Sequence, residues 1–195
     1  MEELLKRYPS LDGVQFDYIR YPDVHPFYGY THANLDRFYK KTGLTSFDET
    51  YEQWKNWKRA QVTEFLEFLV KRTRKIRPGI RISTTGCIPY VRAYHEAFQD
   101  WPQWLDRALV DFVTVMDYSA DPVEFQRFLV DAKGKTKHPE RMNVAVGAYK
   151  KETTAHSCAS QWGICETSSC GKCVAFYYGN FSKNAALAVA LTETS

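Results

Sequence analysis

Residues 12–22 read DGVQFDYIRYP, and this segment is the most informative one for the architecture of the chain. It opens with an Asp-Gly turn and continues through apolar and β-favouring residues, so it predicts a strand. Pro22 ends the strand, because proline has no N–H to donate to a neighbouring strand. One acid, Asp17, lies inside this segment with apolar and aromatic residues on either side.

Strands and helices alternate from this stretch to the end of the chain. Four further strands are predicted at residues 80–86, 110–118, 143–149 and 173–180. Helices are predicted at residues 46–76, 101–109, 154–167 and 184–191, and another begins at Pro122 with Asp121 as its N-cap. The first of these helices has a capping box from Ser46 and Glu49. Residues 23–45 show no periodicity and are expected to form a long loop.

This alternation predicts a parallel sheet with right-handed crossovers, either an open doubly wound sheet or part of a closed barrel. The glycine-rich phosphate loops of nucleotide-binding folds are absent. Each predicted strand instead ends in polar or aromatic residues, which are Asp17, Ser83, Asp117, Tyr149 and Tyr178. Barrel enzymes carry their chemistry at the C-terminal ends of the strands, so the pattern favours an α/β partial barrel.

Composition sets the broad class. The chain has 195 residues, of which 44% are hydrophobic and 15% aromatic, enough for one domain spanning residues 1–195. A net charge of +3 does not suggest a nucleic-acid partner. No run of about 18 apolar residues predicts a membrane span, and the first residues carry no secretion signal. No metal site or cofactor is expected.

The cysteines are concentrated near the C-terminus. Four of the five lie within residues 158–173, and Cys170 and Cys173 have the CxxC spacing of zinc sites and redox pairs. A second pair with that spacing is missing. Reduced thiols are therefore the expectation, with a local disulfide and a zinc site as alternatives.

Several motifs together resemble one known family. Residues 12–22 resemble the DGIHFDYIRYP signature of the glycoside hydrolase-like 10 family. Further similarity, in the same order along the chain, covers the WxxWRxxxV helix start (residues 54–62), the QDWxxWL and (V/I)Dx(I/V) segments (residues 99–105 and 110–113), the PMxY strand end (Met116 and Tyr118) and the FSY motif (residues 176–178).

The resemblance implies a (β/α)8 barrel in which residues 12–22 form the fourth strand. This chain would then hold strands four to eight, with the first three βα units absent. We therefore expect a fragment whose partner is the N-terminal half of the barrel. The family is typically exported and acts on polysaccharides of the cell envelope or outside the cell, in some members on peptidoglycan glycan strands. A polysaccharide or oligosaccharide is accordingly the expected substrate.

Glycoside hydrolysis usually needs two carboxyl groups. Asp17 is the first candidate, because an acid within an apolar strand is costly to bury without a functional partner. Its neighbour Arg20 is positioned to form an ion pair with it or to hold a hydroxyl or carboxylate of the substrate. Asp117 is the preferred second carboxyl on position alone. Glu152 is an alternative, whereas Asp100 is expected to cap a helix.

Aromatic side chains are candidates for stacking against sugar rings. The predicted substrate-binding residues are Arg20 and four aromatic residues, Tyr21, Tyr118, Tyr178 and Trp101. His25 and His32 in the expected loop are weaker candidates for binding a metal or the substrate. Two alternative functions remain open: a carbohydrate-binding or vestigial barrel remnant, and a chitinase-like barrel that lacks its acidic glutamate, since Ile19 and Arg20 occupy that neighbourhood.

Overall fold

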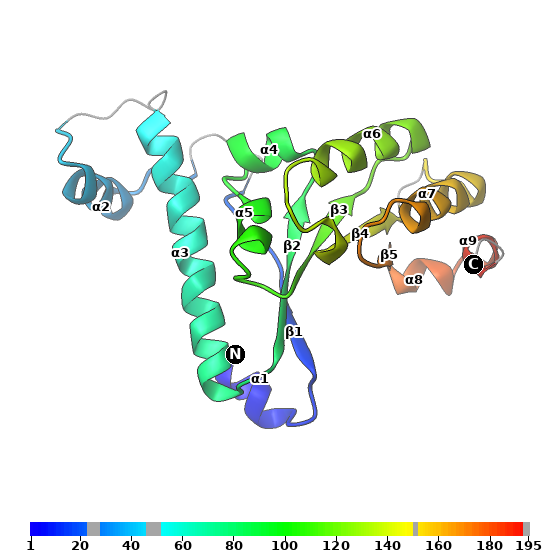
Figure 1. The fold of residues 1–195 in the computed structure, drawn as a ribbon, viewed down its shortest axis with the longest axis horizontal. Coiled ribbons are helices and arrows are strands. Elements are labelled where there is room, and N and C mark those ends of the chain that lie inside the picture. Colours follow the sequence, from blue (N-terminus) through cyan, green and yellow to red (C-terminus); the bar gives the residue numbers. More distant parts are fainter. Residues whose placement is uncertain (23–27, 46–51, 150–151, 193–195) are drawn as a thin grey trace.

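The computed structural model describes residues 1–22, 28–45, 52–149 and 152–192. Five parallel strands form one sheet in the order of the sequence (Figure 1). They are β1 (Gly13–Phe16), β2 (Arg81–Cys87), β3 (Phe112–Asp117), β4 (Met142–Gly147) and β5 (Cys173–Phe176). Each coincides with a predicted strand, so the expected α/β partial barrel is confirmed.

The register of the strands brings all their C-terminal ends to one edge of the sheet. Phe16 lies opposite Thr84, Cys87 opposite Met116 and Gly147 opposite Phe176. Residues that follow these strands are therefore neighbours in space, although they lie far apart in the sequence. Within the described residues, β1 and β5 are the outer strands of the sheet.

Helices connect the strands. They are α1 (Glu2–Arg7), α2 (His32–Thr42), α3 (Glu52–Ile76), α4 (Tyr90–His95), α5 (Trp101–Asp106), α6 (Pro122–Lys133), α7 (Ala155–Thr167), α8 (Tyr178–Phe181) and α9 (Ala185–Thr192), with the 3-10 turn η1 (Pro139–Arg141). Figure 1 shows α5, α6 and α7 along the same side of the sheet. Within the described residues, no helix is long and apolar enough to cross a bilayer.

The expectation of a long loop over residues 23–45 is wrong in its second half, which contains α2. Thr31 caps this helix by accepting a hydrogen bond from the amide of Asn34, and Gly43 ends it with a positive φ of 72°. Its one buried side chain, Phe38, lies 5.1 Å from the ring of Trp54 on α3. The predicted capping box of Ser46 and Glu49 lies outside the described residues.

Trp101, expected to contact sugar, belongs to the core instead. It is fully buried, and its indole Nε1 donates a hydrogen bond of 3.0 Å to the carbonyl of Cys87. Trp101 is the first residue of α5, and Asp100 stands at the N-cap position of this helix. The Asp100 side chain caps nothing there and accepts a hydrogen bond from the Tyr90 hydroxyl. Asp121, in contrast, caps α6 as predicted.

The cysteines also depart from the expectation of reduced thiols. Cys165 near the end of α7 and Cys173 at the start of β5 form a disulfide. The short connection between these elements returns the chain past α7, so the two Cα atoms lie 6.0 Å apart. Cys87, Cys158 and Cys170 are free thiols. Among the described residues, no cluster of three or more His, Cys, Asp or Glu side chains is arranged to hold a metal ion.

Candidate active site

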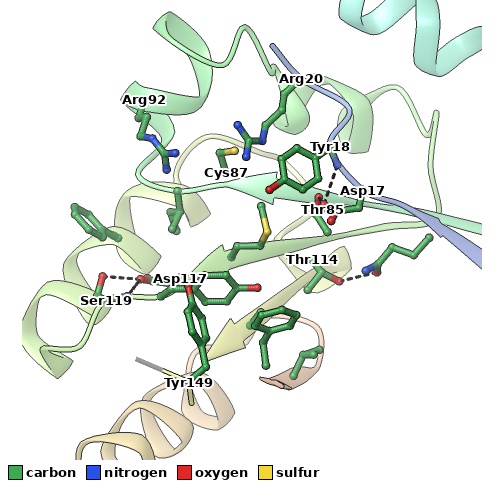
Figure 2. A pocket seen from close by; sticks show the side chains of 18 of the residues that line it. Asp17, Tyr18, Arg20, Thr85, Cys87, Arg92, Thr114, Asp117, Ser119 and Tyr149 are labelled. Carbon is green, nitrogen blue, oxygen red and sulfur yellow. Dashed lines mark hydrogen bonds between the residues drawn. The ribbon is translucent and has the colours of Figure 1, made fainter. Parts of the chain in front are cut away.

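A cavity of about 690 Å³ lies at the C-terminal edge of the sheet (Figure 2). Residues on, or directly after, each of the strands β1 to β5 line this cavity. It contains three acids, two arginines and a group of aromatic rings, which are Asp17, Asp117, Glu124, Arg20, Arg92, Tyr18, Tyr118, Phe128, Tyr149 and Phe176. Four of the predicted site residues, Asp17, Arg20, Asp117 and Tyr118, are thereby brought together.

Asp17 directly follows β1. Its Oδ1 accepts a hydrogen bond of 2.6 Å from the hydroxyl of Thr85 on β2 and one of 2.8 Å from the amide of Tyr18. Tyr18 has a positive φ of 57°, which turns the chain sharply after the acid. Asp17 is solvent-exposed at the cavity wall, so its carboxylate is oriented by two donors and still accessible.

Asp117 ends β3 on another part of the same cavity. It is fully buried, and its Oδ1 accepts a hydrogen bond of 2.8 Å from the hydroxyl of Ser119 and one of 3.3 Å from the Ser119 amide. The two acids come from strands separated by β2 alone. One carboxylate is thus open to solvent and the other enclosed, a difference of environment that active sites use to give two acids different roles.

The floor between the acids is polar. The side-chain carbonyl of Gln15 on β1 accepts hydrogen bonds from Ser83 on β2, at 3.2 Å, and from Thr114 on β3, at 3.3 Å. These side chains alternate with core-facing residues along their strands, as expected of residues that face the inside of a barrel. Polar inward positions of this kind suit a substrate with many hydroxyl groups.

One wall of the cavity, beside Asp117, is aromatic. The rings of Tyr118 and Phe176 are stacked with centroids 5.3 Å apart, and Tyr149 meets both edge-on. Gly147 makes this wall possible, because a side chain there would come within 2.9 Å of the Cβ of Tyr118. Burial, the neighbouring Tyr149 and the charge of Asp17 raise the pKa of Tyr118, so its hydroxyl remains protonated and able to donate.

Other predicted site residues lie away from the cavity. Tyr21 packs edge-on against Phe98, with centroids 5.6 Å apart, and Trp101 is in the core. Tyr178 begins α8 with 83% of its surface exposed, because β5 ends two residues earlier at Phe176, which takes the place in the cavity.

The weaker candidates do not reach the cavity either. Glu152 is exposed and is not among the residues that line it. His32 begins α2 on the surface. His25 lies outside the described residues.

Two important residues were not predicted. Thr85 bonds to Asp17, and its only sequence signal is its position near the end of a strand. Gln99 is fully buried and links the segments around the site: its Nε2 donates to the carbonyls of Ile19 and Thr85, both at 3.1 Å, and its Oε1 accepts from the amide of Cys87 at 2.7 Å. Gln99 belongs to the QDW segment, which resembles a family motif, but the sequence alone indicated no role for this side chain.

Comparisons with known proteins agree with this architecture. The model of the glycosyl hydrolase-like 10 family matches residues 1–163. Among solved structures, the chain is similar to bee venom hyaluronidase in complex with a hyaluronic acid tetramer, with a TM-score of 0.54 and 10% sequence identity over 98% of this chain and 70% of that chain. At that identity, the likeness concerns the fold alone. No curated protein sequence matches the chain.

Proposed function

Because this chain belongs to the glycosyl hydrolase-like 10 family, we propose that it is a glycoside hydrolase domain that cleaves O-glycosidic bonds in a polysaccharide. The observation that carries the proposal is the presence of two carboxyl groups, Asp17 and Asp117, in one cavity at the C-terminal ends of the strands. A (β/α)8 barrel places its chemistry at this edge. Fold alone would not support an enzyme, so the argument rests on the site.

Asp17 is the proposed nucleophile or electrostatic stabiliser. Both of its donors, Thr85 and Tyr18, bond to Oδ1, so Oδ2 is the oxygen we propose to face the anomeric carbon. Asp117 is the proposed acid, because a general acid must carry a proton at the start of the reaction and its enclosed position suits that role. The proton would pass from Asp117 to the oxygen of the leaving sugar as the glycosidic bond breaks, and a water molecule that gives a proton back to Asp117 would then add to the anomeric carbon.

The substrate is proposed to be a polymer, with peptidoglycan glycan strands as the first candidate. The cavity supports this proposal, since its aromatic wall of Tyr118, Tyr149 and Phe176 can stack against a pyranose while the floor offers hydrogen bonds. The similar hyaluronidase was solved with a hyaluronic acid tetramer, which also favours a long glycan. Such a polymer lies outside the cytoplasm, and we propose an exported location for the parent protein.

Closure of the barrel is part of the proposal. The sheet holds five strands, and an outer strand such as β1 or β5 carries N–H and C=O groups that further strands can pair with. Three additional parallel strands would complete an eight-strand barrel and cover the open side of the cavity. We therefore expect activity to be highest when an N-terminal barrel half is supplied.

A non-catalytic carbohydrate-binding role is the second candidate. The aromatic wall and polar floor favour it, because these features bind sugar without any need for the two acids. The chitinase-like alternative has less support, since Ile19 is buried in the core and offers no acid at that neighbourhood.

The release of new reducing ends from a glycan panel distinguishes catalysis from binding. We would compare the chain with Asp17→Asn, Asp117→Asn and the control Asp36→Asn, an exposed acid on α2, each with and without the N-terminal barrel half. Catalysis predicts a rate loss of about 100-fold or more for the two site variants alone. Glycan binding without cleavage by any of the proteins would support the binding role instead.

A further inference from the structure

Two arginines meet on one side of the cavity. Arg20 lies just after β1, whereas Arg92 lies on α4, which follows β2 after a short turn. Since β1 and β2 are adjacent and parallel, both side chains arrive at the same edge of the sheet. Figure 2 shows the two guanidinium groups directed toward Cys87, at the end of β2, and all three residues line the cavity.

The charge of Arg20 acts inside the cavity. Burial raises the pKa of the Cys87 thiol, the nearby Arg20 guanidinium lowers it, and the Asp17 carboxylate raises it again. Arg20 and Asp17 thus both act on one buried sulfur atom. The guanidinium of Arg20 also lies 4.7 Å from the ring centroid of Tyr18, a cation–π contact that restricts where its planar face can point.

Two acids that line the cavity, Asp117 and Glu124, have partners of their own. Asp117 is enclosed and bonded to Ser119, and Glu124 on α6 forms an ion pair with Arg127 at 3.5 Å. The aromatic wall, which includes Tyr118, carries no charge. The two arginines therefore lie on the same side of the cavity as Asp17, whereas Tyr118, Tyr149 and Phe176 form its aromatic wall.

A carboxylate is the group that fits such a pair of guanidiniums. Arginine binds planar carboxylates through two parallel N–H donors, and these charge-assisted hydrogen bonds are roughly twice as strong as neutral ones. A neutral sugar would need hydrogen-bonding partners only, and the side chains of Gln15 and Thr114 line the cavity with such groups.

We propose that Arg20 and Arg92 form a carboxylate-binding subsite, so that the glycan bound here carries acidic sugars, such as uronic acid residues, next to the bond beside Asp17. This inference rests on the proposed function, because it assigns the substrate class of the same cavity. It makes the two arginines specificity-determining residues, while Asp17 and Asp117 keep the chemistry.

Binding of paired glycans tests the subsite without turnover. Calorimetric titration of the Asp117→Asn protein would use hyaluronan and oligogalacturonate oligomers and bacterial glycan strands, each beside its carboxyl-reduced derivative. We expect the acidic form of the cognate pair to bind about 10-fold more tightly. In the same background, Arg92→Gln and Arg20→Gln should reduce this ratio to about one or two, and Arg92→Lys should give an intermediate ratio.

The matched control is Arg107→Gln. Arg107 is also a partly exposed arginine, but it pairs with Glu67 and does not line this cavity, so the preference should persist. The inference is overturned if no acidic glycan of the panel binds, if acidic and reduced forms bind equally, or if the Arg20 and Arg92 variants keep the preference. Circular dichroism of each variant separates a lost subsite from a lost fold.

These outcomes separate the inference from the proposed function. A protein that prefers acidic glycans but cleaves none of them supports the carboxylate subsite and contradicts the hydrolase. A protein that cleaves neutral or carboxyl-reduced glycans as fast as acidic ones supports the hydrolase and contradicts the subsite.

Discussion

Replacing Gln99 by leucine should both destabilise the fold and disorganise the site. The amide side chain of Gln99 holds three backbone groups, the carbonyls of Ile19 and Thr85 and the amide of Cys87, at 3.1, 3.1 and 2.7 Å. Leucine has a similar volume but no polar atoms. The change therefore removes hydrogen bonds without opening a large cavity, which keeps the interpretation simple.

The magnitude follows from the number of groups left unsatisfied. A buried polar group that loses its partner costs about 1–3 kcal/mol. The Thr85 carbonyl still has the Thr84 hydroxyl at 3.3 Å, so the amide of Cys87 and the carbonyl of Ile19 account for most of the loss. We expect Gln99→Leu to lower the free energy of unfolding by about 2–6 kcal/mol, a large part of the stability of a typical domain. For a chain of this length, at about 2–4 °C per kcal/mol, the midpoint of thermal unfolding should fall by about 4–24 °C.

Gln161→Leu provides the matched control. Gln161 on α7 is also fully buried, but its side chain makes a single hydrogen bond among the described residues, from Nε2 to the carbonyl of Ser119 at 2.7 Å. We expect about half of the loss seen for Gln99→Leu, because one group rather than two loses its partner. Calorimetry would measure both unfolding midpoints, and glycan cleavage would be followed well below them.

The activity readout tests the positioning role separately. Ile19 lies between Asp17 and Arg20, so release of its carbonyl should loosen both side chains and reduce kcat even where the protein is folded. Equal unfolding midpoints for Gln99→Leu and Gln161→Leu, together with wild-type cleavage, would refute this reasoning.

Two further predictions concern the wall and the disulfide. Gly147→Ala places a methyl group about 2.9 Å from the Cβ of Tyr118, so we expect the free energy of unfolding to fall by about 1–3 kcal/mol and glycan binding to weaken. The control Gly163→Ala, with no atom within 4 Å of the added methyl group, should cost no stability. Equal effects of the two variants in thermal unfolding would contradict this prediction. The Cys165–Cys173 disulfide closes a short loop with a sequence separation of 8, so Cys165→Ala/Cys173→Ala should cost about 2–3 kcal/mol in denaturant unfolding. Insensitivity of the wild-type midpoint to a reducing agent would argue against that bond.

Much of the fold was predictable because its signals are local. The apolar runs that form β1 to β5 and the helical periodicity between them indicate a parallel α/β sheet on their own. Asp17 and Asp117 could be placed together from topology, since residues that follow parallel strands meet at one edge. The same reasoning applies to Arg20 and Tyr118.

The features that sequence reasoning missed depend on tertiary contacts. Helix α2 is an exception, because Leu35, Phe38 and Tyr39 recur at helical spacing on its apolar face and the sequence therefore carried a signal for it. The burial of Trp101 depends on how α5 packs behind the sheet, and an aromatic residue in a core looks the same in sequence as one that stacks on a sugar. The role of Gln99 cannot be read locally either, because one of its partners, Ile19, is 80 residues away.

The most direct test of the central claim is whether Asp17 and Asp117 act in one reaction. We would measure kcat for Asp17→Asn, Asp117→Asn and the double variant on the glycan that the chain cleaves. If both acids serve the same bond cleavage, the double variant should be no more than about 10-fold slower than the slower single variant, because residues that act as a unit are strongly non-additive. Multiplied losses in the double variant, or wild-type rates in either single variant, would contradict the account.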